Sequence, residues 1–173
     1  MTVPRFRVGQ GLDLHPFSDD PDRPLVLGGV AFPGERGLAG HSDADVVAHA
    51  VTDALLGAAG LGDIGQHFPD TDPALAGADS LELLRRAVAD VRAAGWVPAN
   101  VDCTVVLDRP KLAPVRAELE ARLSEVVGAP VTVKGKRTEG IGALGRAEGA
   151  LCLAVALVHD EPTHRLRAHP RPE

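Results

Sequence analysis

The chain has 173 residues, with 24 acidic and 18 basic side chains and a formal net charge of −6. This length fits one domain with a hydrophobic core, and 45% hydrophobic against 24% charged residues excludes an intrinsically disordered protein. The acidic balance argues against nucleic acid as the main partner, the nine-residue apolar run over 150–158 is too short to span a membrane, and the first residues carry no secretory signal.

Two strands and a helix open the predicted fold. Residues 6–14 alternate loosely and contain two glycines, which is typical of a strand that another segment approaches closely. Residues 25–32 are predicted to form one strand that is broken by a glycine pair. Ser42 begins the first helix, because Ser42-x-x-Asp45 resembles a capping box before an apolar stripe, and Gly60 ends it.

The rest of the chain alternates helices and strands. The predicted elements are a polar loop over 68–73, a helix from Ser80 to Gly95, a strand over 101–107, a helix from Pro114 to Gly128, a strand over 131–133 and a strand over 149–158. We expect the last strand to be buried on both faces, because it is almost wholly apolar. The tail over 159–173 is predicted to be disordered.

This order of elements predicts an α/β fold: a single domain over 1–158 with a mixed β-sheet and helices on one face. The bare face of the sheet needs a partner, which indicates an oligomer. Cys103 and Cys152 stand alone in apolar runs, so we expect buried thiols in a cytoplasmic protein.

Two segments offer ligands for a metal ion. Asp13 and His15 are two residues apart on a strand and share a face, while Asp45, His49 and Asp53 share a stripe of the first helix. One carboxylate and two imidazoles suit zinc with an open fourth position, and either helix aspartate could hold the His49 tautomer. The alternative is that His15 is a turn residue and His49 a solvated helix residue.

The glycines of Gly140-x-Gly142-x-x-Gly145 match the dinucleotide fingerprint, but the strand that follows leaves no room for the helix that such a site needs. A glycine loop can still hold phosphate through its backbone N–H groups. Lys134, Lys136, Arg137 and Arg146 bring positive charge there, and Glu139 is a candidate Mg²⁺ ligand. A solvated basic loop is the alternative.

Three stretches together resemble one family. They are Gly9-x-Gly11-x-Asp13-x-His15, the run from His41-Ser42-Asp43 to Ala58, and the run from Leu61-Gly62-Asp63 to Pro73. The family is that of the 2-C-methyl-D-erythritol 2,4-cyclodiphosphate synthases of the non-mevalonate isoprenoid pathway. The resemblance covers about residues 5–158.

The resemblance implies an enzyme that cyclises 4-diphosphocytidyl-2-C-methyl-D-erythritol 2-phosphate and releases CMP. It implies a homotrimer in which the sheets pack together and the active sites lie between subunits. Zn²⁺ would bind Asp13, His15 and His49, and Mg²⁺ or Mn²⁺ would bridge the substrate phosphates at Glu139. His41 would stabilise the transition state.

The resemblance also implies a set of substrate-binding residues. For the phosphates and sugar hydroxyls they are Ser42, Asp63, Ile64, Gly65, Phe68, Pro69, Asp70, Thr71 and Asp72; for the cytidine, Leu107, Pro110, Lys111, Leu112 and Ala113; and in the last third of the chain, Lys136, Thr138, Ala143 and Arg146.

Two positions depart from the family pattern. Arg137 stands where a threonine usually contacts the diphosphate, which gives that catalytic position a cation of different reach, and Ala143 stands where an aromatic residue is common. These departures favour two alternatives: a zinc-dependent phosphohydrolase, and a non-catalytic module that binds a metal or an isoprenoid diphosphate.

Overall fold

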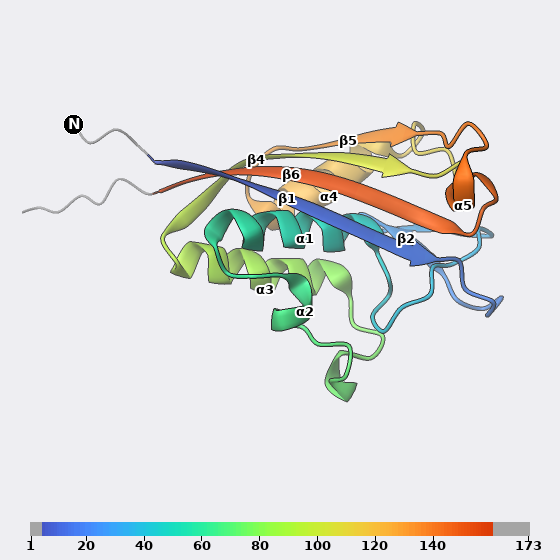
Figure 1. The fold of residues 1–173 in the computed structure, drawn as a ribbon, viewed down its shortest axis with the longest axis horizontal. Coiled ribbons are helices and arrows are strands. Elements are labelled where there is room, and N and C mark those ends of the chain that lie inside the picture. The colour runs from blue at the N-terminus through green and yellow to red at the C-terminus, as the bar shows by residue number, and fades with distance from the viewer. Residues whose placement is uncertain (1–4, 161–173) are drawn as a thin grey trace, which may run out of the picture.

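The structure, a computed structural model, describes residues 5–160. Its centre is a four-stranded sheet in the order β1-β6-β4-β5 (Figure 1). β1 (Phe6–Pro16) pairs antiparallel with β6 (Gly149–Asp160), β6 pairs antiparallel with β4 (Trp96–Val106), and β4 pairs parallel with β5 (Val131–Lys136). The predicted mixed sheet in a single α/β domain is confirmed.

The helices lie on one face of this sheet. α1 (Val46–Ala59) packs against β1 and β6, α3 (Ser80–Ala93) lies beneath α1, and α4 (Arg116–Val127) packs against β5 (Figure 1). The shorter elements are α2 (Ile64–His67), a 3-10 turn over Pro73–Leu75, and α5 (Gly142–Gly145). Within the described residues, no helix is long and apolar enough to cross a membrane.

Two glycines of β1 bring α1 directly onto the strand. A Cβ atom on Gly11 would lie 1.9 Å from the Ala50 carbonyl oxygen, and one on Gly9 would lie 2.0 Å from the Ala54 carbonyl oxygen. No side chain fits there, so the strand and helix backbones touch. Because Asp13 follows these glycines on the same face of the strand, it also faces α1.

The glycine pair after Leu27 makes a turn, so the predicted single strand over 25–32 is wrong. Gly28 and Gly29 have φ angles of +56° and +73°, a region that glycine enters without strain. β2 (Leu25–Leu27) and β3 (Val30–Phe32) therefore pair as an antiparallel hairpin.

The first helix begins later than predicted. Asp45, rather than Ser42, is its N-cap, and one Asp45 oxygen accepts hydrogen bonds from the backbone N–H groups of Val47 and Ala48. The same carboxylate also accepts from Gly28 N and Gly29 N, so it joins the helix to the hairpin turn. A carboxylate with four N–H donors makes a stronger cap than a serine hydroxyl.

The last strand is buried on one face only, which corrects the expectation of two buried faces. On the face away from the helices, Leu153 and Val155 of β6 are exposed beside Phe6, Val8, Leu12 and Leu14 of β1. We call these six side chains the apolar sheet face. β6 also extends to Asp160, two residues into the predicted tail. The remainder of that tail, 161–173, lies outside the described residues.

Candidate metal-dependent active site

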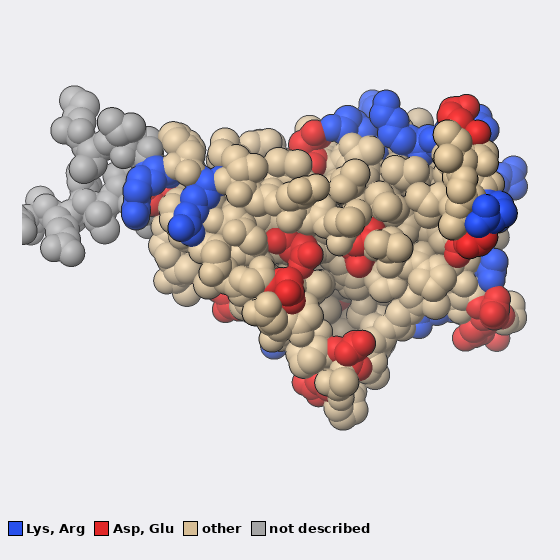
Figure 2. Space-filling view, in the orientation of Figure 1, with Lys and Arg blue, Asp and Glu red and all other residues tan. Residues whose placement is uncertain are grey.

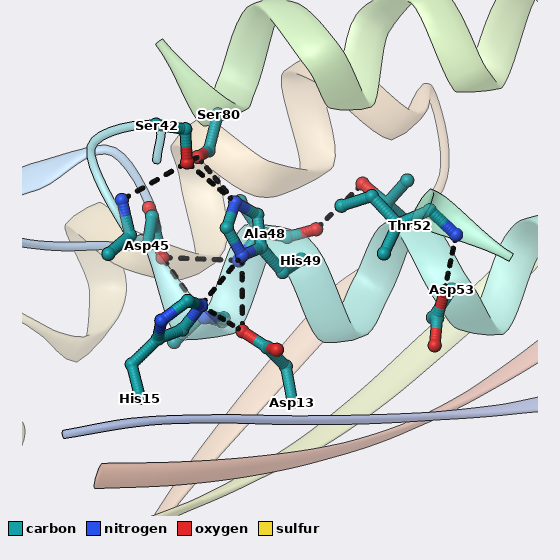
Figure 3. Close-up of polar contacts among 12 residues, drawn as sticks. Asp13, His15, Ser42, Asp45, Ala48, His49, Thr52, Asp53 and Ser80 are labelled. Atoms are coloured by element: carbon teal, nitrogen blue, oxygen red, sulfur yellow. Dashed lines mark hydrogen bonds and ion pairs between the residues drawn. The ribbon is translucent and has the colours of Figure 1, made fainter. Parts of the chain in front are cut away.

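Three predicted metal ligands meet between β1 and α1 (Figure 3). Asp13 Oδ2 lies 3.1 Å from His15 Nε2 and 3.1 Å from His49 Nδ1, and the two imidazole nitrogens are 3.2 Å apart. His49 is buried and the other two are half-buried. His49 is therefore not the solvated helix residue of the alternative interpretation.

The hydrogen bonds around His15 fix which of its nitrogens faces the cluster. His15 Nδ1 lies 2.7 Å from the Ala39 carbonyl oxygen, which can only accept, so Nδ1 carries a proton and Nε2 is the nitrogen that faces Asp13. Burial alone would raise the pKa of Asp13, but hydrogen bonds with His15 and His49 hold it far below its ordinary value. Burial opposes protonation of His15, yet Asp13 raises the pKa of that imidazole.

This donor set fits a divalent metal ion. One carboxylate oxygen and two imidazole nitrogens, all within 4.8 Å of one another, point at a common centre. Such a three-residue set is typical of zinc sites that leave a position open for a substrate. The structure thus contains an Asp-His-His metal-binding group at the predicted residues.

The cluster forms part of the wall of a cavity of about 440 Å³. That volume is large enough for a small organic ligand beside the ion. Its lining includes, besides the three metal ligands, the predicted residues His41, Ser42, Ile64, Gly65, Phe68, Pro69 and Asp70. The segment before α1 and the segment around α2 therefore reach the same cavity as the metal ligands.

Hydrogen bonds attach the predicted sugar-binding segment to its surroundings. His41 Nε2 donates to the Asp72 carbonyl oxygen at 2.8 Å, and Gly77 N donates to the His41 carbonyl oxygen at 2.7 Å. Asp63 caps α2 by accepting from Gln66 N. Thr71 lies in the turn between α2 and the 3-10 turn over Pro73–Leu75.

Neither helix aspartate holds the His49 tautomer, which corrects that prediction. Asp45 caps α1, and Asp53 accepts a hydrogen bond from Ile64 N at 2.8 Å and so anchors the start of α2. The ring nitrogen of His49 that faces away from Asp13, Nε2, instead lies 2.8 Å from Ser80 Oγ and 3.1 Å from Ser42 Oγ.

Two contributing residues escaped the sequence analysis. Ser80 was recognised only as a helix start, and its contact with His49 depends on how α3 packs against α1. Arg23 donates from Nε to the Leu38 carbonyl oxygen and from Nη2 to the Ser42 carbonyl oxygen, each at 2.5 Å. It thereby braces the segment that carries Ala39, His41 and Ser42, and no motif marks it.

A second cavity, of about 760 Å³, lies by the carboxyl ends of β4 and β5. Figure 2 shows Lys and Arg side chains gathered over this end of the sheet. Its lining includes the predicted residues Leu107, Pro110, Lys111, Leu112, Ala113, Lys136 and Arg137, together with Arg109 and Arg116. It shares no lining residue with the first cavity.

Charge in this second cavity is predominantly positive. Asp108 is already engaged, because it accepts hydrogen bonds from Thr138 N at 3.1 Å and from Thr138 Oγ1 at 2.5 Å. Those bonds hold the pKa of Asp108 below its ordinary value. Arg137 lies 3.8 Å from the same carboxylate and is 76% exposed, so its guanidinium is available to an anionic ligand.

The other predicted residues of the last third lie apart from both cavities. Glu139, Ala143 and Arg146 line neither of them, and Arg146 Nε pairs with Glu148 Oε1 at 2.7 Å. α5 provides one short helical turn where the glycine motif was predicted to leave no room for a helix. Within one copy of the chain, Glu139 is not among the ligands grouped around Asp13.

Comparisons with known proteins agree with this geometry. A model of the YgbB family matches residues 6–159. The chain is 58% identical over 161 residues to the 2-C-methyl-D-erythritol 2,4-cyclodiphosphate synthase of Bordetella petrii, covering 91% of this chain and 98% of that protein. It is 57% identical over 157 residues to the Chromobacterium violaceum synthase, covering 88% and 98%.

Solved structures give the same result. The bifunctional IspDF of Campylobacter jejuni matches with a TM-score of 0.87 at 38% identity, covering 92% of this chain and 43% of that one. The CDP complex of IspF from Plasmodium falciparum matches with a TM-score of 0.78 at 30% identity, covering 92% and 99%.

Proposed function

The chain belongs to the YgbB family, and we propose that it catalyses the reaction for which its curated relatives are named, the formation of 2-C-methyl-D-erythritol 2,4-cyclodiphosphate. It is a lyase that acts on 4-diphosphocytidyl-2-C-methyl-D-erythritol 2-phosphate and releases CMP. The observation that carries this function is the Asp13-His15-His49 cluster in the wall of a cavity that is bordered by the segment around α2.

The reaction needs no nucleophile from the protein. An oxygen of the 2-phosphate bonds to the β-phosphorus, and the bond from that phosphorus to the oxygen bridging the two phosphates breaks. The electron pair of that bond leaves with CMP, and no water is consumed. Positioning of the two phosphates and stabilisation of their charge therefore account for catalysis.

Zinc is the ion that best suits Asp13, His15 and His49, because one carboxylate and two imidazoles are its usual protein ligands. When bound, such a divalent ion supplies charge stabilisation to phosphoryl oxygens. In this proposal Glu139 would hold a second ion, Mg²⁺ or Mn²⁺, which would offset the negative charge of the substrate phosphates. This second role rests on the family resemblance and on the preference of Mg²⁺ for one or two carboxylates plus phosphate oxygens.

The residues of the first cavity bind the sugar end of the substrate. His41 and Ser42 lie beside the metal ligands and contact the phosphates, with His41 stabilising the charge of the transition state. The erythritol and ribose hydroxyls are held by five residues that line the cavity, Ile64, Gly65, Phe68, Pro69 and Asp70, and by their sequence neighbours Asp63, Thr71 and Asp72.

The basic second cavity receives the cytidine. Backbone groups of Leu107, Pro110, Leu112 and Ala113 border the base, and Lys111 and Lys136 face the nucleotide phosphates. Arg137 supplies the cation next to the reacting diphosphate, and Thr138 positions Asp108. Ala143 and Arg146 are kept as substrate-binding residues on the family resemblance alone. Relatives have been solved with CDP bound, which supports this nucleotide class.

A homotrimer with active sites between its subunits would unite the two cavities. Each chain carries the metal group in one cavity and the cations in another, with no shared lining residue. The exposed apolar sheet face supplies a surface for packing between copies. We place the enzyme in the cytoplasm, since Cys103 and Cys152 are free buried thiols.

Turnover in ¹⁸O-labelled water tests the proposal against zinc-dependent phosphate hydrolysis, the alternative that uses the same three ligands. Cyclisation predicts CMP and a cyclic diphosphate without any solvent oxygen, because the attacking oxygen comes from the substrate. One ¹⁸O atom in CMP or in a linear phosphate product would instead identify a hydrolase and overturn the proposal.

A further inference from the structure

The ring of His49 is held from both sides, and only one side belongs to the metal cluster. Its Nδ1 faces Asp13 and His15, while its Nε2 faces the hydroxyls of Ser80 and Ser42 (Figure 3). The side chain of Ser80 has no exposed surface, and Ser42 and His49 are less than a tenth exposed. Water therefore does not compete for these contacts.

A carboxylate determines the direction of the hydrogen bond between Ser80 and His49. Ser80 Oγ makes a short hydrogen bond to Asp43 Oδ1, and Asp43 also accepts from Asp45 N at 3.1 Å and from Ser80 N at 3.2 Å. Carboxylate oxygens accept, so the single hydroxyl proton of Ser80 goes to Asp43. Toward His49, Ser80 is then left only with lone pairs.

The proton on the imidazole follows from this arrangement. Because Ser80 Oγ can only accept at 2.8 Å, His49 Nε2 must donate. When an ion occupies the cluster, an imidazole with its proton on Nε2 offers the ion the lone pair of Nδ1, the atom that faces Asp13. Ser42 does not disturb this order, since its own hydroxyl lies 3.4 Å from Ser80 Oγ and can donate there.

We propose that Ser80, held by Asp43, is the positioning residue that fixes the tautomer of His49 and commits its Nδ1 to the metal ion. Ser80 itself contacts neither metal nor substrate. The inference rests on the metal site proposed above. Asp43 also joins the metal site to the turn before α3, because its backbone N–H donates to the Ala78 carbonyl oxygen at 3.0 Å.

Ring ¹H–¹⁵N correlation spectra of the metal-free wild-type protein test the tautomer directly. We expect Nε2 of His49 to carry a proton donated to Ser80, whether or not Asp13 also holds a proton on Nδ1, with His49→Ala used to assign the signals. An Nε2 without a bound proton would overturn the proposal. This measurement needs no substitution at Ser80, so it stands even if a Ser80 variant fails to fold.

Zinc affinity, measured by competition with a chelator, tests whether the contact with Ser80 strengthens metal binding by His49. Ser80→Ala should weaken zinc binding about 10- to 100-fold, the usual effect of losing a hydrogen-bond partner of a metal-ligating histidine, and should leave His49 as a mixture of tautomers. Thr52→Val is the matched control. It also removes a fully buried hydroxyl, but this one lies on α1 and donates to the Ala48 carbonyl oxygen instead of contacting His49. Its zinc affinity should equal that of the wild type.

The outcomes separate this inference from the metal assignment. Equal zinc affinity in Ser80→Ala and wild type would show that Ser80 does not position His49. A wild-type protein that has the Nε2 proton but binds no zinc would overturn the metal assignment and leave the control of the tautomer by Ser80 standing.

Discussion

Asp13 is the residue on which the cluster depends, since its carboxylate oxygen lies 3.1 Å from a nitrogen of each histidine. Residue type and strand or helix spacing made all three side chains candidate ligands but left open that His15 is a turn residue and His49 solvated, and the family resemblance selected the set. The contact with Ser80 could not be predicted, because 31 residues separate it from His49 and the packing of α3 decides their distance.

The imidazole of His49 can be removed to test the metal assignment. His49→Ala should abolish turnover and bound zinc, because only two of three ligands remain. The fold should persist, since the side chain lies at the edge of the cavity. Metal analysis of the purified variant and a CMP-release assay measure both effects. Full activity in this variant would contradict the zinc ligand set.

Arg137 tests the charge of the second cavity. Arg137→Ala should lower kcat/KM about tenfold or more, because a charge-assisted bond to phosphate contributes about 1.5–3 kcal/mol. Arg85→Ala, which removes an exposed arginine on α3 paired with Glu82, is the control and should leave kcat/KM unchanged. Equal kinetics for Arg137→Ala and wild type would show that this cation does not contact the diphosphate.

At the scale of the elements, the long helices and strands could be predicted because their apolar periodicity matches the faces that they bury. The exact start of α1 could not be predicted. Asp45, rather than Ser42, is its N-cap because the Asp45 carboxylate also accepts hydrogen bonds from Gly28 N and Gly29 N in the hairpin turn. The β2–β3 hairpin could not be predicted either, because a glycine pair in an apolar run also fits a single interrupted strand.

The contact between β1 and α1 gives a test at this scale. Gly11→Ala should lower the free energy of unfolding by about 1–3 kcal/mol or more and weaken zinc binding, because the new methyl meets the Ala50 carbonyl oxygen and pushes His49 away from Asp13. Chemical denaturation and chelator competition measure the two effects.

Gly57→Ala is the matched control for Gly11→Ala. Gly57 lies exposed on α1 and its added Cβ would be 3.9 Å from the Gln10 carbonyl oxygen, an ordinary contact. The substitution should stabilise the protein by about 0.5–1 kcal/mol through helix propensity. If Gly11→Ala proved as harmless as Gly57→Ala, the direct contact of the two backbones would not position the site.

For the whole molecule, the exposed apolar sheet face and the two separate cavities both point to assembly. The sequence predicted a bare face that needs a partner, but it could not show that the bare face includes Leu153 and Val155 of β6, because that strand is apolar on both sides. The proposed composite site between copies would bring Glu139 of one chain to the Asp13 cluster of another, a contact that one chain does not make by itself.

Leu12→Glu tests this assembly. A carboxylate in the middle of the apolar sheet face should convert the proposed trimer to monomers, since burying an unpaired charge between copies is costly. It should also abolish turnover, because the proposed composite site would not form. Ala121→Glu, on the exposed side of α4, is the control and should assemble as the wild type does. Light scattering after gel filtration distinguishes these states. A trimeric Leu12→Glu variant would place the interface elsewhere.

Phosphorus NMR of the protein with its diphosphocytidyl substrate, zinc and Mg²⁺ tests the central claim most directly. The account predicts CMP and a cyclic diphosphate in equal amounts in the wild type, and none in the metal-free protein until zinc is restored. CMP with a linear phosphate, or an unchanged substrate spectrum in the zinc-loaded protein, would contradict it.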